Sequence, residues 1–190
     1  MYWLLRLSPS TENSLILHGT PNIMKSLSLD FSIAKPLAEK IPKIEFQIEK
    51  NIEGNITDNL LAYGVRAPFL NAKGLSCLTS LNEKDITFIE TNIMDQRNDT
   101  EYTDYKIINI NQAIHCVNFD DSKLVLRKNG NIKFIDRLVF NERALIEHGI
   151  SICRVAEFLP LIIVSDEIKN KMVNLGITGV NFMRPEDLKL

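Results

Sequence analysis

The sequence lacks a hydrophobic run that could cross a membrane. A membrane-spanning helix needs about 18 consecutive apolar residues, and every apolar stretch of this 190-residue chain is shorter. Its apolar start, MYWLLRLSPS, is interrupted by Arg6, Ser8 and Pro9 and has neither a preceding basic region nor a following small-residue cleavage site. Such a start is not typical of a secretory signal. We therefore expect a cytoplasmic protein that does not contact a membrane.

Cysteine is scarce. The three cysteines are Cys77, Cys116 and Cys153, and an odd number at wide spacing does not indicate a disulfide framework. A reactive thiol or a metal ligand is the functional interpretation. Buried free thiols in a reducing compartment are the interpretation that we favour.

The chain also lacks an excess of charge of one sign. It carries 22 lysines and arginines against 24 aspartates and glutamates, which gives a formal net charge of −2. Proteins that bind nucleic acid usually carry a basic excess, so we expect no direct binding of nucleic acid. The remaining composition is that of a globular protein long enough to bury a sizeable core, and we expect a single domain over residues 1–190.

Recognisable catalytic motifs are missing. The sequence has no phosphate-binding loop, dinucleotide-binding glycine pattern, nucleophile elbow or zinc-ligand spacing. The histidines His18, His115 and His148 are scattered, and His115 beside Cys116 is the most suggestive pair. Neighbouring side chains of a strand point in opposite directions, so these two could not act together there. We expect no enzyme, no metal and no cofactor.

Alternating apolar and polar residues predict an α+β protein with mixed and antiparallel sheets. Asn129-Gly130 lies between two alternating runs in residues 123–140 and is the strongest hairpin signal of the chain. The other expected strands are Tyr2–Leu7, Ile44–Ile48, 103–110 and 151–158, and residues 112–117 form either a strand or a short helix.

A strand–helix–strand unit is predicted near the end of the chain. Residues 161–164, LIIV, are typical of a strand covered on both faces. Ser165 is the expected N-cap of a helix, with two carboxylates in its first turn. Gly176 is the expected residue after the helix end. Residues 177–182 then return as a strand that Pro185 ends.

A similar unit is predicted earlier in the chain. Asn71 is a plausible N-cap, Leu75, Leu78 and Leu81 fall on one helical face, and residues 85–93 alternate as a strand. A shift of ninety-four residues aligns this unit with the later one. The sequence leaves open whether this is an internal duplication or two independent units with the same packing needs. The aligned pairs are Leu70 with Val164, Asn71 with Ser165, Leu78 with Met172, Leu81 with Leu175, Ile86 with Val180 and Phe88 with Phe182.

Acidic residues gather at two places. Carboxylates in turn-rich segments without ligand-like spacing argue against a metal site. They form either ordinary solvated loops or a surface for a basic partner, and the interleaved tyrosines are good interface anchors. The candidate contact residues are Asp95, Asp99, Glu101, Tyr102, Asp104 and Tyr105 in one segment and Asp120 and Asp121 in the other.

The C-terminal run ICRVAEFLPLIIVSDEIKNKMVNLGITGVNF, 152–182, resembles the end of family eleven of the immunity proteins of polymorphic toxin systems, formerly a domain of unknown function. The similarity continues in order through residues 56–78, 85–93 and 105–122. The chain departs from the family at Cys153, where an aromatic residue is usual, and at Asn71 and Ala72, where serine and an acid are frequent. The C-terminal motifs lie at Ile152–Arg154, Phe158, Pro160, Ile163–Ser165 and Gly176–Phe182.

This resemblance implies an antitoxin that binds and neutralises a cognate toxin domain in the cytoplasm, in a one-to-one complex. The family is often encoded beside nuclease toxins of the HNH type. The resemblance divides the chain into an N-terminal β-rich part, 1–54, and a family-like core, 55–190. Two alternatives remain: an enzyme that reverses a toxin's modification, and a non-catalytic adaptor for a secretion component.

Overall fold

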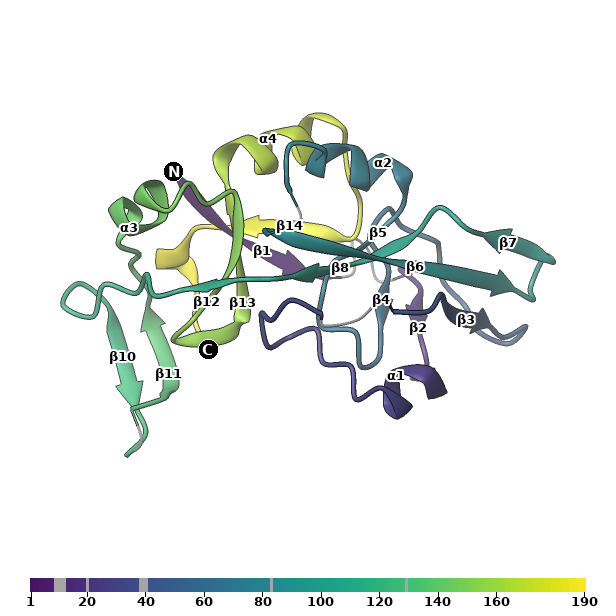
Figure 1. Cartoon of the computed structure of the whole chain (residues 1–190), viewed down its shortest axis with the longest axis horizontal. Helices are drawn as coiled ribbons and strands as arrows, with labels where there is room; N and C mark the ends of the chain where they lie inside the picture. The colour runs from purple at the N-terminus through teal and green to yellow at the C-terminus, as the bar shows by residue number, and fades with distance from the viewer. Residues whose placement is uncertain (9–12, 20, 38–40, 83, 129) are drawn as a thin grey trace.

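A computed structural model describes residues 1–8, 13–19, 21–37, 41–82, 84–128 and 130–190. Within these ranges the strands form two five-stranded sheets and two smaller two-stranded sheets. Short helices cover them at several places (Figure 1). The predicted α+β class with mixed sheets is confirmed.

The first large sheet has the order β14-β1-β13-β12-β9. Neighbouring strands are antiparallel except β9, which pairs with β12 in parallel. The prediction for Tyr2–Leu7 is confirmed as β1. The other strands are β9 (Ala113–Ile114), β12 (Ile152–Val155), β13 (Phe158–Ser165) and β14 (Val180–Met183).

The second large sheet is built around the long strand β6 (Ile86–Asp95). The first half of β6 pairs with β8, and its second half pairs with β3 in parallel and with β7 in an antiparallel hairpin. The turn-rich acidic segment 94–104 therefore contains the end of β6 and the strand β7, and the strand expected at 103–110 begins only at Lys106. The other strands are β3 (Ile44–Ile48), β5 (Phe69–Leu70), β7 (Thr100–Tyr102) and β8 (Lys106–Ile110).

The remaining elements are short. Strands β10 and β11 pair antiparallel, which confirms the predicted hairpin, although Asn129 of its turn lies outside the described residues. The small strands are β2 (Ile16–Leu17), β4 (Leu61–Ala62), β10 (Lys123–Leu126) and β11 (Ile132–Arg137). The α-helices are α1 (Asn22–Ser26), α2 (Ala72–Leu75), α3 (Glu142–Glu147) and α4 (Asp166–Asn174), and 3₁₀ turns cover Ser76–Leu78 and Pro185–Asp187.

Both predicted strand–helix–strand units have the same topology. Strand β8 lies between β5 and β6 and runs antiparallel to both, and β1 lies in the same way between β13 and β14. The residue pairing between the middle strand and its two neighbours is also the same in the two units. Phe69 and Ile86 pair with Ile107 and Ile110, while the residues ninety-four positions later, Ile163 and Val180, pair with Leu4 and Leu7. The middle strand follows its unit in one case and begins the chain in the other.

The predicted caps of the two unit helices are confirmed. The Asn71 side chain accepts a hydrogen bond from the Gly74 amide at 3.0 Å, and Ser165 Oγ accepts from the Ile168 amide at 3.4 Å. Gly176 follows α4 with φ of 60°, the left-handed conformation that favours glycine. The first helix is shorter than predicted, because α2 ends at Leu75 and continues only as a 3₁₀ turn.

The two units share one hydrophobic cluster. The 3₁₀ turn after α2 lies against α4 above both sheets (Figure 1). Residues that the ninety-four-residue shift aligns are buried together there: Leu70 with Val164, Leu78 with Met172, and Ile86 with Val180. Equivalent positions therefore have equivalent packing, as both the duplication and the convergent interpretation require.

Two local predictions are corrected. Residues 151–158 were expected to form one strand, but β12 ends at Val155 and β13 begins at Phe158, so that the segment contains a tight turn. The turn-forming residues before Leu60 also predict a short turn with Asp58 as its cap. In the structure the Asp58 carboxylate instead accepts hydrogen bonds from both the amide and the hydroxyl of Thr178, at 2.9 and 3.0 Å. No helix in the described ranges is long and apolar enough to cross a membrane.

Candidate partner-binding surface

The second half of β6, with β3 and β7 on its two sides, forms a sheet with one buried and one solvent-facing side. The IEFQI sequence of β3 alternates buried and exposed residues along its whole length. Ile44, Phe46 and Ile93 are buried in the core. Because side chains alternate along a strand, the residues between them must point to the opposite side, where Glu45, Gln47 and Met94 are exposed.

The solvent-facing side carries three glutamates, one from each strand. Strand pairing places Glu45 beside Asn92, and Met94 beside Glu101. Glu90 lies two residues before Asn92 on the same side of β6. We call this surface the acidic face. It consists of Glu45, Gln47, Glu90, Asn92, Met94 and Glu101.

Few positive charges neutralise the acidic face. Lys106 Nζ lies 2.6 Å from Glu90 Oε1. Glu101 Oε1 accepts a hydrogen bond from the Asn92 amide at 2.6 Å, which holds the carboxylate in place but leaves its charge. Across the residues with described positions, Glu45 and Glu101 have no ion-pair partner. The surface therefore has a negative potential and is suited to a basic partner.

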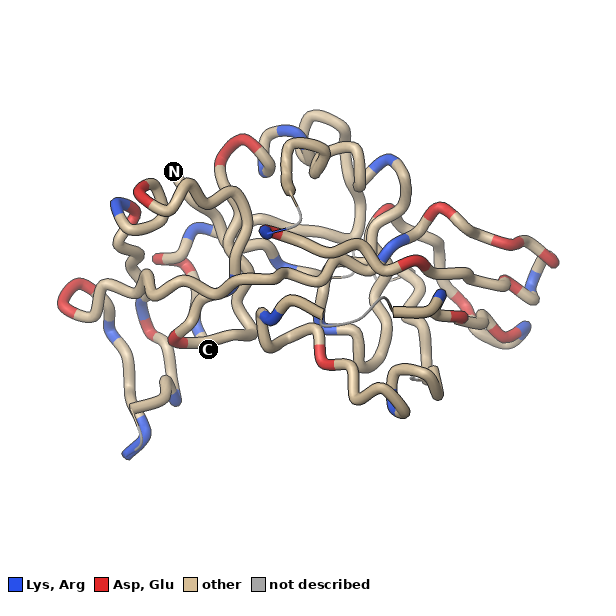
Figure 2. Tube along the Cα trace, in the orientation of Figure 1, with Lys and Arg blue, Asp and Glu red and all other residues tan. Residues whose placement is uncertain are grey.

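Four of the predicted contact residues lie on β7 or beside it. Asp99, Glu101 and Asp104 are exposed, and Tyr102 is half-buried. Asp99 has φ of 54° in the turn that joins β6 to β7, and Asp104 Oδ2 lies 3.4 Å from the Ala72 amide. The acidic segment of the sequence therefore extends the acidic face around the β6–β7 hairpin (Figure 2).

Asp95 is corrected from a surface candidate to an interior residue. Its exposed fraction is 0%, and its two oxygens accept hydrogen bonds from Arg97 Nε at 2.8 Å and Nη2 at 2.7 Å. These hydrogen bonds lower the pKa of Asp95. Arg97 also donates to the Gly54 carbonyl oxygen at 2.7 Å. The pair therefore shapes the β6–β7 turn and attaches it to the loop after β3.

Tyr105 is corrected in the same way. Its ring is buried, and its hydroxyl donates a hydrogen bond to the Thr57 carbonyl oxygen at 2.7 Å. The ring meets the rings of Phe69 and Tyr102 edge-on, at centroid distances of 5.9 and 6.2 Å. Tyr105 thus supports Tyr102 from below and is not itself available to a partner.

The second acidic cluster lies far from the first. Asp120 and Asp121 occupy the exposed turn that precedes β10, at the opposite end of the long axis from β7 (Figure 2). Asn118 organises this turn by accepting from the Asp120 amide at 3.1 Å and donating to Asp121 Oδ2 at 2.6 Å. The structure therefore does not bring the two predicted clusters into one surface.

Sequence reasoning missed five of the six members of the acidic face. Glu45, Gln47, Glu90 and Met94 are exposed and Asn92 is half-buried, all on strands whose alternation was recognised. The signal was present, because a buried face in IEFQI and in residues 86–94 implies an exposed face made by the residues in between. Which strands lie side by side was not visible in the sequence.

The pair His115 and Cys116 does not form a catalytic arrangement. The His115 side chain is 85% exposed, with Nδ1 3.4 Å from Glu157 Oε1. Cys116 is 1% exposed, and burial raises the pKa of its thiol, which disfavours the reactive thiolate. All three cysteines are free and buried, as expected. Among the described residues, no group of three or more histidines, cysteines or acids could hold a metal ion.

No family model matches the chain, and no curated protein matches it.

Proposed function

We propose that this protein is an immunity protein that binds a bacterial toxin domain through the acidic face and neutralises it. The observation that carries the proposal is that Glu45, Glu90 and Glu101 lie on the same side of three neighbouring strands, extended by Asp99 and Asp104. Among the described residues, one lysine forms an ion pair with these glutamates. The remaining negative charges attract a partner of complementary charge.

A nuclease toxin has the chemistry that fits this face. An enzyme that cleaves nucleic acid presents a basic surface to the phosphate backbone. Carboxylates that cover such a surface exclude the substrate and accelerate association by electrostatic attraction. Met94 and Phe88 are exposed beside the glutamates and supply apolar contact area. We expect a one-to-one complex with an interface of about 1,600 Å² or more.

The residues that carry the family resemblance are consistent with a scaffold role. Ser165 caps α4, and Arg154 is buried with its guanidinium on backbone carbonyl groups. These roles concern folding, so recognition belongs to loops and exposed faces elsewhere. The proposal therefore places binding on the β3–β6–β7 surface and not on the C-terminal motif.

Co-expression with the toxin domain encoded beside this protein tests the proposed function. Growth rescue together with a complex that co-purifies supports an immunity protein that acts by binding. Rescue without a complex contradicts the proposal and points to enzymatic reversal of the toxin's modification. Binding to a delivery domain without rescue also contradicts it and points to an adaptor. A catalytically inactive toxin domain serves as the control for toxicity.

A further inference from the structure

A pocket opens where the strands β1 and β13 separate. Their pairing ends at Leu5 with Ile162. Beyond that point β1 continues beside β14 only, whereas the start of β13 turns toward β12. The resulting cavity has a volume of about 410 Å³, within the range of about 300–1,000 Å³ that is usual for small-molecule sites.

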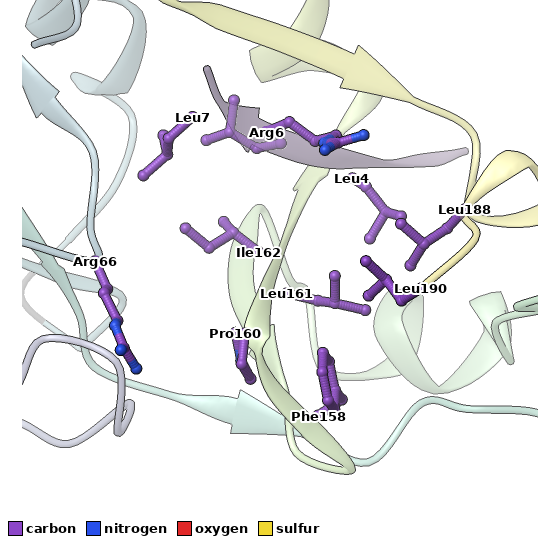
Figure 3. A pocket seen from close by; sticks show the side chains of 11 residues that line it. Leu4, Arg6, Leu7, Arg66, Phe158, Pro160, Leu161, Ile162, Leu188 and Leu190 are labelled. Carbon is purple, nitrogen blue, oxygen red and sulfur yellow. The ribbon is translucent and has the colours of Figure 1, made fainter. Parts of the chain in front are cut away.

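The walls of the pocket are mostly apolar, with two arginines. Figure 3 shows Leu4, Leu161, Leu188 and Leu190 gathered on one side of the pocket and Arg66 on the opposite side. Arg6 belongs to the β1 wall. Both arginines are exposed. None of the described acidic residues lines the pocket. The apolar lining residues are Leu4, Leu5, Leu7, Phe158, Pro160, Leu161, Ile162, Leu188 and Leu190.

Neither Arg6 nor Arg66 forms an ion pair with a described residue. Asp30 is near enough for the charge of Arg66 to contribute to the lowered pKa of its carboxyl group, although hydrogen bonds from Ser32 are the main cause. Both Ser32 donors bind the same oxygen, Asp30 Oδ1, at 2.6 and 2.9 Å. Because Arg66 is exposed and forms no ion pair with a described residue, an anion from solution can reach its guanidinium.

A buried arginine holds two walls of the pocket together. Arg154 is 1% exposed. Its guanidinium donates to the backbone carbonyl oxygens of Leu159, at 2.9 Å, and Arg66. Leu159 belongs to the β13 wall, and Arg66 is the opposite wall. A buried cation is costly to place in a protein interior unless hydrogen bonds and nearby charges compensate it. Backbone carbonyl groups bind this guanidinium, and the charge of Asp30 also favours it. The arrangement therefore fixes the two walls of the pocket relative to each other.

We propose that this pocket binds a small amphipathic anion, with an aliphatic chain along the leucines and an anionic head group on Arg66. An aliphatic chain can pack against the apolar lining, which is mostly leucine and also includes Phe158 and Pro160. The planar guanidinium matches the paired oxygens of a carboxylate or a phosphate. This proposal is independent of the toxin-binding role, since the pocket and the acidic face are made by different strands.

Calorimetric titration of the purified full chain with decanoate, decyl phosphate and 1-decanol, all below their micelle concentrations, tests the pocket. We expect saturable binding of at least one anion at a single site. Arg66→Gln should weaken that binding about tenfold or more. The same substitution should leave the binding of 1-decanol unchanged, because the apolar residues that contact the aliphatic chain of the ligand are not altered. The tighter of the two anions identifies the head group.

Arg143→Gln is the matched control, since Arg143 is an exposed arginine on α3 that pairs with Glu147 and does not line the pocket. Its affinity for the anion should equal that of the unmodified protein. Arg66→Gln preserves the backbone carbonyl that Arg154 binds, and Arg66 is exposed, so the variant should fold. Absence of saturable binding of both anions below about 1 mM, or equal weakening by the two variants, would overturn the proposal.

Discussion

The guanidinium of Arg154 donates a hydrogen bond at 2.9 Å to the backbone carbonyl oxygen of Phe31, 123 positions earlier in the chain. Phe31 belongs to the hydrophobic cluster under the β3–β6 sheet, whereas Arg154 lies on β12 of the other large sheet. Burial lowers the pKa of Arg154 to about 10, so the side chain stays charged at neutral pH. One charged side chain therefore connects the two sheets through backbone groups.

Replacing Arg154 by methionine should destabilise the protein by about 3 kcal/mol or more. The substitution keeps an unbranched apolar chain but leaves three carbonyl groups without their donor, each at a cost of about 1–3 kcal/mol if it stays buried. Urea denaturation measures the change. The control is Arg137→Met on the exposed side of β11, which should change stability by no more than about 0.5 kcal/mol. Equal effects of the two substitutions would contradict this role of Arg154.

Gly179→Ala should destabilise the protein more than Gly130→Ala. The two glycines have nearly equal φ angles, 82° and 83°, so the backbone strain of alanine, about 1–2 kcal/mol, is common to both. A Cβ at Gly179 would overlap the carbonyl oxygen of Asn59, while one at Gly130 meets nothing within 4 Å. Thermal unfolding of the two variants isolates the close approach between the β14 turn and the 56–59 loop. An equal loss of thermal stability in both variants would contradict this, because it would mean that the contact with Asn59 can widen without a cost in stability.

The Asp95–Arg97 pair should make stability depend on pH in the acid range. Hydrogen bonds from Arg97 lower the pKa of Asp95 below the unfolded value of 3.8. The unfolded chain therefore binds the proton first as the pH falls. The stabilisation is complete above this value and is lost as the pH falls through the folded pKa.

Asp95→Asn should accordingly reduce the free energy of unfolding more at pH 7 than at pH 3, in urea titrations at both values. Glu147→Gln removes an exposed carboxylate that pairs with Arg143 on α3 and is the control, with a small effect at both pH values. A pH-independent loss at Asp95 would show that its charge is not the stabilising feature.

Local chemistry made several elements predictable from sequence. Tyr2–Leu7 and Ile44–Ile48 are strands with the predicted bounds. Ile44–Ile48 alternates apolar and polar residues, and Tyr2–Leu7 is a short, mostly apolar run, which are both strand signals. Asn71 and Ser165 cap helices because their side chains reach amides three residues ahead. Such features depend on a few neighbouring residues and need no knowledge of the tertiary structure.

Other elements had weaker signals or depended on distant contacts. The turn between β12 and β13 is formed by Ala156 and Glu157, which are not turn-forming residues. Helix α3 was missed although Asn141 accepts a hydrogen bond from the Ala144 amide and Gly149 follows the helix with φ of 61°. That helix is only six residues long, which is too short to show a clear helical periodicity of apolar residues.

In the candidate surface, too, neighbouring residues could be predicted from sequence, whereas burial and strand pairing could not. Asp95 and Asp99 are indistinguishable as acids in one polar segment, yet one is buried against Arg97 and the other is exposed. Their difference arises because β6 continues to Asp95 and the chain then turns back into β7. Glu45 joins the same face only because β3 pairs with β6 in parallel, a contact between segments more than forty residues apart.

The most direct test of the account is the association rate of the toxin domain with two charge-reversed variants of this protein. Glu45→Lys/Glu101→Lys reverses two charges on the acidic face, and Asp120→Lys/Asp121→Lys reverses two at the opposite end of the molecule. We expect the first variant to associate about tenfold or more slowly at low salt and with a weaker salt dependence, and the second to associate at nearly the unmodified rate. Equal rates for the two variants, or a slower rate for the second alone, would contradict binding through the acidic face.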